Sequence, residues 1–401
     1  MKRSSTGHFL PITVGDQRVQ SFIPLALPPT PGIDWTAALT LLFEEAMLAL
    51  GRLESTYELV PIAQRLQAHL EKKEALASCM LEGNQVCLRD VFLHELGLAG
   101  DTAREGVMRV RLAYEAMQHG WDRLEEGLPL SLRFIRSLHF QLFKSVKNVR
   151  GRPGEFRNIQ NWVGDPQPQY AIYVPAPIEA MLETLIEFER FMVSHPEPIF
   201  TLARAGFAHV QFATILPFEE GNGIVGRMLI SHILRDHKML ARPTFMPSIY
   251  ILQHRETYYQ LIRCVHEMGD WELWLAYFAK MIRAGAEHWI ESVLRLHRLI
   301  ESDRRLIEKQ SSAPASVMSV LDVMIDRPII TGTMLSDVTQ MTPTTINRIL
   351  TRLMELGIIE EVSGKKRNRL YVYKALMDTL SDGLPTEPVD MRYKTYSEVA
   401  R

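Results

Sequence analysis

The chain has 401 residues, 46% of them hydrophobic and 23% charged, which places it among ordinary globular proteins with two or three domains. Its formal net charge of -2 excludes a global drive toward nucleic acid or membrane, so any such surface must be local. The three scattered cysteines disfavour a disulfide framework and favour a reducing, cytoplasmic compartment. We recognise no signal peptide and no apolar run near the roughly 18 residues of a membrane helix, so we expect no membrane partner.

The first 33 residues are predicted to form an extended arm over a surface, because the prolines between positions 24 and 31 cannot occupy a helix interior. A helical pattern then begins at Asp34, whose side chain can cap it. Residues 74–83 indicate a second helix that ends at Gly83, since glycine is favoured just after a helix.

Helical periodicity continues over residues 85–147 and includes His139 on an apolar face. We interpret His139 as a packed or surface histidine, because no second ligand lies three or four residues away. Breakers at 151–157 precede two short runs of β-formers, at 158–163 and 171–174, which predict a hairpin. Two further helices are expected at about 178–194 and 199–214. His209, on the second, is typical of a hydrogen-bonded core residue, with a displaced catalytic base as the alternative.

Residues 215–227, ILPFEEGNGIVGR, join that helix to another that runs to about residue 237. Glycines allow the backbone to approach a ligand closely, and the N-terminus of the next helix favours an anion. Asn222 can donate from its amide, Glu220 is an oxygen ligand suited to Mg²⁺, and Arg227 can reach back to a phosphate. The stretch therefore predicts a phosphate-binding loop. A glycine-rich connection with solvated carboxylates is the alternative.

A long charged helix is predicted at 287–308, followed by a break at 310–314 and a second domain. Helices at 315–325, 333–340 and 342–356 and a hairpin over 358–373 resemble a winged helix-turn-helix. Such a domain presents its third helix and the basic hairpin tip to DNA. The candidate DNA-binding residues are Thr344, Asn347, Arg348, Lys365, Lys366 and Arg367. Protein contacts or intramolecular regulation are the alternatives.

The central stretch resembles the signature of Fic-domain proteins, H-P-F-x-[D/E]-G-N-G-R-x-x-R. The matching positions are Pro217, Phe218, Glu220, Gly221, Asn222, Gly223 and Arg227. The chain departs from the signature at Leu216, where the family has histidine, and at Ile224, where it has arginine. The resemblance covers roughly residues 20–290 and is strongest over 201–280.

This resemblance implies a mainly α fold, a Fic-like helical bundle with a β-hairpin flap that pairs with a target polypeptide. It implies transfer of AMP from ATP to a target hydroxyl, with Mg²⁺ held by the acidic residue and the signature histidine as general base. The nucleotide-binding residues would be Phe218, Gly221, Asn222, Gly223, Arg227 and Tyr258, with Glu220 on the metal. Tyr258 or Tyr259 would stack on adenine, and core packing is the alternative.

Residues 78–83 resemble the inhibitory helix motif [S/T]-x-x-x-E-[G/N] of many Fic proteins, with Ser78, Glu82 and Gly83 at its defined positions. By that resemblance Glu82 forms a salt bridge with Arg227 and crowds the site of the γ-phosphate, which prevents productive ATP placement. An exposed glutamate before a helix stop is the alternative.

Leu216 cannot act as a base, and general-base assistance is worth about 10²–10⁴-fold, so we expect AMP transfer to be weak or absent. One alternative is an active transferase whose base is Glu219 or a bound water. A variant reaction with another phosphate-containing donor belongs to the same alternative. Another is a DNA-binding regulator whose Fic-like domain is a sensor or dimerisation scaffold. The target protein stays open, as does a homodimer. We expect five segments: 1–110 with the inhibitory motif, the Fic-like core at 111–285, a connecting helix and linker at 286–314, the winged helix at 315–380 and a tail at 381–401.

Overall fold

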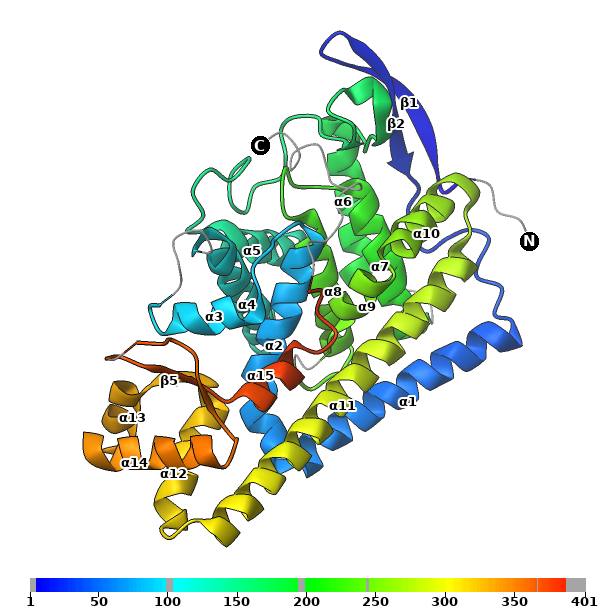
Figure 1. Cartoon of the computed structure of the whole chain (residues 1–401). Helices are drawn as coiled ribbons and strands as arrows, with labels where there is room; N and C mark the ends of the chain where they lie inside the picture. The colour runs from blue at the N-terminus through cyan, green and yellow to red at the C-terminus, as the bar shows by residue number, and fades with distance from the viewer. Residues whose placement is uncertain (1–4, 99–103, 194–198, 243–244, 366, 387–401) are drawn as a thin grey trace.

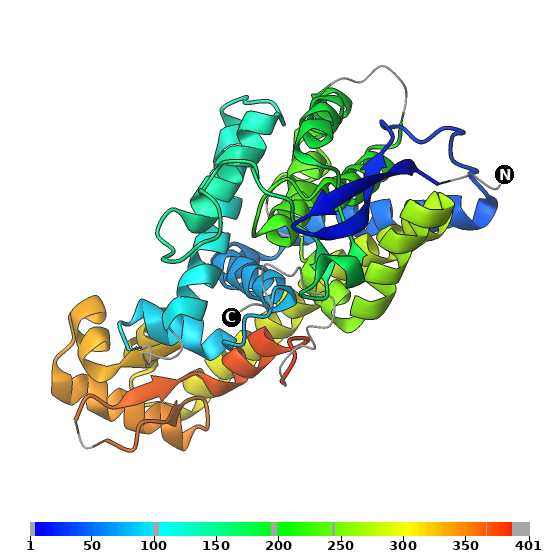
Figure 2. The same cartoon turned by 90° about the horizontal axis from the view of Figure 1, so that it is seen from above.

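The computed structural model describes residues 5–98, 104–193, 199–242, 245–365 and 367–386. Within these ranges the chain is mainly helical, as the sequence predicts, with small antiparallel sheets at two ends of a helical body (Figure 1). Seen from above, the N-terminal hairpin lies across the helices at the end opposite the C-terminal domain (Figure 2). Among the helices described, none combines the length and the apolar character that crossing a bilayer requires.

The helical body has two buried central helices, with the others arranged around them. In chain order its helices are α1 (Ala37–Leu59), α2 (Pro61–Leu81), α3 (Leu88–Glu95), α4 (Arg104–Glu125), α5 (Leu132–Phe143), α6 (Ile178–Val193), α7 (Thr201–Ile215), α8 (Asn222–Asp236), α9 (Pro247–Gln253), α10 (Arg255–Met268) and α11 (Trp271–Gln310). Nearly every residue of α7 and α8 is buried, because most of their residues are small or apolar. The loop between them is also mostly buried.

The N-terminal arm is extended, as predicted, and its residues 7–24 form a β-hairpin that was not predicted. β1 (Gly7–Val14) pairs antiparallel with β2 (Gln17–Pro24) in register over all eight positions. The missed signal is the alternation of exposed Arg18 and Gln20 with buried Val19 and Ser21. The Phe22 N–H donates to the Val174 carbonyl at 2.8 Å, which attaches the hairpin to the flap.

The flap itself is present but shorter than predicted. Its strands are β3 (Val163–Gly164) and β4 (Ala171–Tyr173), joined through a short 3-10 helix, η1 (Pro168–Tyr170). The predicted cap of α1 was also wrong. The Thr36 hydroxyl accepts the Leu39 N–H at 3.2 Å, whereas the Asp34 N–H donates to Glu272 at 2.8 Å.

α11 is one continuous helix of 40 residues, where the sequence predicted a separate helix at 287–308. It runs along α1 and then out to the C-terminal domain (Figure 1). Its first turns are fixed in the core by buried Trp271 and Trp274, and the Trp274 Nε1–H donates to the Gly206 carbonyl at 2.9 Å. The predicted break is confirmed and short, because α11 ends at Gln310 and the next helix begins at Pro314.

The C-terminal domain contains the predicted helices and hairpin, and one strand that the sequence did not reveal. Its elements are α12 (Pro314–Asp326), β5 (Ile329–Thr331), α13 (Gly332–Thr339), α14 (Pro343–Glu355), β6 (Glu360–Glu361), β7 (Leu370–Val372) and α15 (Lys374–Ser381), with strand order β5-β7-β6. The domain contacts the body through α2. Arg65 pairs with Asp322 and Asp326 at 3.1 and 3.0 Å, and His69 Nε2 donates to the Ile325 carbonyl at 2.9 Å.

Helix α2 also carries a buried carboxyl group, Glu74, which accepts hydrogen bonds from the N–H and hydroxyl of Ser248 on α9. Burial raises the pKa of Glu74 from 4.5 to about 8. The folded protein therefore keeps this proton up to about pH 8, while the unfolded chain loses it near 4.5. The resulting stabilisation is complete below pH 4.5 and is lost as the pH rises toward 8.

We therefore expect Glu74→Gln, which resembles the neutral acid, to remove one pH-dependent component of stability. Between pH ~5.5 and ~7.5 the free energy of unfolding of the parent should fall relative to this variant by about 1 kcal/mol per pH unit. Urea unfolding at several pH values measures this difference. Glu58→Gln, at an exposed carboxylate, is the control. Parallel pH profiles for the parent and Glu74→Gln would contradict the prediction.

Candidate active site

The loop between α7 and α8 is closed by its own polar groups. Leu216 ends α7 in the left-handed conformation, with φ 46° and ψ 62°, and Gly221 begins α8 with φ 79°. The Phe218 N–H donates to Asn222 Oδ1 at 2.9 Å, and Asn222 Nδ2 donates to the Phe218 carbonyl at 2.7 Å. The Asn222 side chain thus closes the loop with its oxygen and with one of its two amide hydrogens.

Arg157, which is not part of the loop, also holds it in place. Its backbone N–H donates to the Pro217 carbonyl at 2.8 Å, and its guanidinium donates to the carbonyls of Leu216 at 2.9 Å and Ala176 at 2.6 Å. Burial lowers the pKa of Arg157 to about 10, so it remains charged at neutral pH. No local pattern could predict this role, because the residues that Arg157 joins are 19 to 60 positions away.

His139, on α5, packs beneath the loop and is not a ligand, which confirms the prediction. Its ring stacks on Phe218 with centroids 3.9 Å apart. Nε2 donates to the Glu220 carbonyl at 3.0 Å, and Nδ1 accepts the Gly154 N–H at 2.9 Å. Because a carbonyl only accepts and an N–H only donates, these contacts require the neutral Nε2–H tautomer. Burial lowers the pKa of His139 to about 4, which agrees with a neutral ring.

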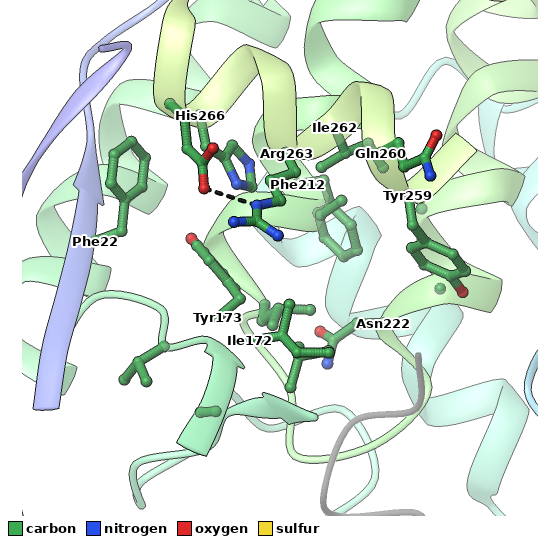
Figure 3. Close-up of a pocket in the computed structure, with 18 of the residues that line it drawn as sticks. Phe22, Ile172, Tyr173, Phe212, Asn222, Tyr259, Gln260, Ile262, Arg263 and His266 are labelled. Carbon is green, nitrogen blue, oxygen red and sulfur yellow. Dashed lines mark hydrogen bonds and ion pairs between the residues drawn. The ribbon is translucent and has the colours of Figure 1, made fainter. Parts of the chain in front are cut away.

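A cavity of about 880 Å³ opens in front of the loop, between the flap, the N-terminal hairpin and α10 (Figure 3). Its lining includes Leu216, Gly221, Asn222 and Gly223 of the loop. Leu216 is only 7% exposed and presents an apolar side chain where the signature has a histidine. The predicted alternative base, Glu219, does not line this cavity, because its carboxyl group packs beside Gly151.

The histidines that line the cavity are already engaged. His209 Nδ1 donates to the Gly226 carbonyl at 2.9 Å, and Nε2 accepts the Tyr258 hydroxyl at 2.7 Å, as expected for a core histidine. His266 Nε2 lies 2.6 Å from Thr214 Oγ1. Burial lowers the pKa of His209 to about 4 and that of His266 to about 3, so both are weak bases.

The two candidate tyrosines differ in exposure. Tyr258 is 3% exposed and bonded to His209, an arrangement that favours the core-packing alternative. Tyr259 is partly exposed and points into the cavity in Figure 3. Ile224, at the position of the signature's first arginine, is 8% exposed and packs in the hydrophobic core.

Glu82 and Arg227 form the ion pair that the sequence predicts, with Glu82 Oε1 2.7 Å from Arg227 Nη2. Ser78 contributes two more acceptors, its hydroxyl and its carbonyl, each 2.9 Å from the guanidinium. Glu82 caps the C-terminus of α2, and Gly83 follows with φ 90°. A Cβ on Gly223 would lie 2.0 Å from Glu82 Oε1, so this carboxylate lies against the first turn of α8, where an anion is favoured.

Glu220, the predicted metal ligand, has both carboxylate oxygens engaged. Oε1 lies 2.6 Å from Arg109 Nη1, and Oε2 accepts the Arg150 N–H at 3.2 Å. Arg109, which comes from α4, was not predicted, because nothing in the local sequence marks it. Among the described residues, no three His, Cys, Asp or Glu side chains gather in a way that could hold a metal. In this arrangement a Mg²⁺ ion on Glu220 would have to compete with Arg109 for the carboxylate.

The candidate DNA-binding residues lie on the surface of the C-terminal domain, apart from the cavity. Thr344, Asn347 and Arg348 are exposed on α14, and Lys365 and Arg367 are exposed near the hairpin tip. Lys366 lies outside the described residues.

The protein is helical, and its signature loop leads directly into the N-terminus of α8. Residues 129–234 match the model described as "Fic/DOC family", and residues 40–122 match "Fic/DOC family N-terminal". A solved structure of a Fic family protein from Desulfovibrio desulfuricans G20 has the same fold, with a TM-score of 0.56, 17% identity, and coverage of 86% of this chain and 98% of that one. The chain is a Fic-domain family protein.

The chain is also similar to proteins named "Protein adenylyltransferase Fic". It is 26% identical over 250 residues to the Drosophila persimilis protein, covering 55% of this chain and 46% of that protein. It is 25% identical over 294 residues to the Drosophila yakuba protein, covering 65% and 56%. The chain thus spans about half the length of the curated relatives it matches.

We expect Arg157→Met to destabilise the protein by about 2–4 kcal/mol, because it leaves buried carbonyls without donors. Urea unfolding measures the loss. Arg152→Met is the matched control, since Arg152 lies in the same turn with its side chain 82% exposed, and a change within about 0.5 kcal/mol is expected there. Equal effects of the two substitutions would contradict the role given to Arg157.

Proposed function

We propose that the chain is a nucleotide-binding relative of Fic adenylyltransferases that is impaired in AMP transfer and inhibited by Glu82. The observation that carries this proposal is the apolar Leu216 in the cavity wall, at the position of the signature's general base. Without a base, the proton of an attacking hydroxyl has no acceptor as the new bond to phosphorus forms. The loss of such a group typically slows a reaction by about 10²–10⁴-fold.

Neither histidine of the cavity wall is available as a substitute for the missing base. His209 has both nitrogens in hydrogen bonds, and His266 is bonded to Thr214 and stacked near Phe22 and Tyr173. The backbone, in contrast, suits a histidine at position 216, because histidine is among the residues enriched in the left-handed conformation. Leu216→His is therefore a fair test of whether the base is what the site lacks.

Phosphate binding is supported by the N-terminus of α8 and by Arg227. In the present state, however, Glu82 supplies the negative charge that Arg227 and the helix terminus attract. A nucleotide phosphate must therefore compete with a carboxylate that is already bound. Removing that carboxylate frees the guanidinium for the ligand.

We expect Glu82→Gly to bind ATP at least about tenfold more tightly than the parent, measured by isothermal titration calorimetry. The reason is that the parent must first break the Glu82–Arg227 ion pair. Glu58→Gly, which breaks a surface ion pair, is the control and should leave the affinity unchanged. Absence of heat with both the parent and Glu82→Gly would contradict nucleotide binding.

For catalysis, we expect no transfer of α-labelled AMP from ATP by the parent and little by Glu82→Gly. The triple variant Glu82→Gly, Leu216→His, Ile224→Arg should label protein at least about 10²-fold faster, because it restores the base and an arginine. The matched control carries Leu216→Met in place of Leu216→His and should stay inactive. Robust labelling by the parent would contradict the proposal that AMP transfer is impaired.

A second function, DNA binding, is favoured by one observation on α14. Its buried residues Ile346, Ile349 and Leu350 face the domain, while Thr344, Asn347 and Arg348 are exposed on the other side. Polar groups on an exposed third helix are suited to base edges and phosphates. The order of elements in the domain is compatible with a winged helix, and its hairpin tip adds exposed positive charge.

We expect Arg348→Ala to weaken binding in gel shifts and to lower the slope of log K against log salt by about 1, the value for one lost phosphate contact. Arg327→Ala, an exposed arginine at the end of α12, is the charge-matched control. If the parent does not bind DNA even at low salt, the proposal of DNA binding is wrong.

A further inference from the structure

The acidic residue of the loop, Glu220, is fully engaged without a metal. Its carboxylate is bound by Arg109 on one oxygen and by the Arg150 N–H on the other, and its backbone carbonyl accepts from His139. Its side chain is only 9% exposed. Each carboxylate oxygen of Glu220 therefore already accepts one hydrogen bond, and a metal would compete with the Arg109 guanidinium for Oε1.

Arg109 is held in place from two sides. Its Nη1 pairs with Glu220 at 2.6 Å, and its Nη2 lies 3.5 Å from Glu105, one turn earlier on α4. Its side chain is 24% exposed, so most of the guanidinium has left water. α4 itself packs against α2 and α8, the two helices that carry Glu82 and the loop.

A divalent cation on Glu220 would have to displace this guanidinium. The displaced charge would remain partly buried with Glu105 as its carboxylate partner, and two cations would then share a small region. A guanidinium cannot lose its proton in the physiological range, so a change in pH does not free Glu220. A cation bonded in this way competes with a second cation for the carboxylate and neutralises its charge.

We propose that the phosphate site of this chain takes a nucleoside polyphosphate without a divalent metal, because Arg109 occupies the carboxylate that would hold the metal. Arg109 neutralises Glu220, so the phosphates do not meet an unpaired carboxylate at the base of the loop. Arg227 supplies positive charge from the first turns of α8. The inference rests on the proposed nucleotide binding and adds the form of the ligand, free of metal.

The first test compares ATP binding in excess Mg²⁺ and in EDTA by calorimetry, in the Glu82→Gly background so that the carboxylate does not compete. The affinity should differ by less than about tenfold between the two conditions. In Glu82→Gly, Arg109→Gln the metal should strengthen binding by more than that, because Glu220 is then free. Glu82→Gly, Arg109→Lys keeps the charge, so Mg²⁺ should change its ATP affinity as little as it does for Glu82→Gly alone.

The matched control is Arg111→Gln, which breaks an ion pair with Glu115 on the same helix without touching the loop. It should leave the metal dependence unchanged. An equal, large effect of Mg²⁺ with and without Arg109 would overturn the inference and leave nucleotide binding intact.

A second test needs no nucleotide. Electron paramagnetic resonance of free Mn²⁺ should show no loss of signal when the parent protein is added. Loss of signal that Glu220→Gln abolishes would overturn the inference. If ATP fails to bind under any condition, the proposed nucleotide binding is wrong, and the Mn²⁺ measurement still decides whether Arg109 excludes the metal.

Discussion

The arrangement at the cavity depends on neutralising one buried guanidinium, that of Arg227. It is 3% exposed, and a charge buried this deeply without a partner costs several kcal/mol. All the partners found for its donors come from the end of α2, through Ser78 and Glu82. The position of α2 relative to α8 is therefore fixed by electrostatics as well as by packing. Glu82 is part of this support, and in the proposed function it is also the group with which a nucleotide phosphate competes.

The shape of the loop and its chemistry are separable in this chain. The contacts that shape the loop are made by Asn222, Arg157, His139 and Gly221, and none of these needs a base at position 216. Leucine fills the place of the signature's histidine without opening the turn. A loop can thus keep a fold typical of a transferase while it lacks the group that takes the proton.

Several features that short motifs define were predicted correctly from the sequence. Gly83 ends its helix, Glu82 meets Arg227, and His209 is a bonded core residue, because each follows from a local pattern or from two matched motifs. Arg109 could not be predicted, since its contact with Glu220 spans 111 positions and has no local signature. α11 begins at Trp271, well before the predicted start at 287, and its interior Gly285 packs closely on Phe245 without interrupting the helix. The hairpin at the N-terminus was hidden by prolines that sit within or beside its strands.

Helix α2 touches the C-terminal domain near its start and the loop at its end. Arg65 and His69 contact α12, and Glu82 lies 17 positions beyond Arg65, about 25 Å along a helix. Glu82 would leave Arg227 without disturbing the contacts with α12 if its side chain rotated or if the helix unwound before Gly83. Rotation of the whole helix would instead break the bond from His69 to Ile325. Only such a rotation would work as a lever, and by linkage it would let the C-terminal domain act back on the loop.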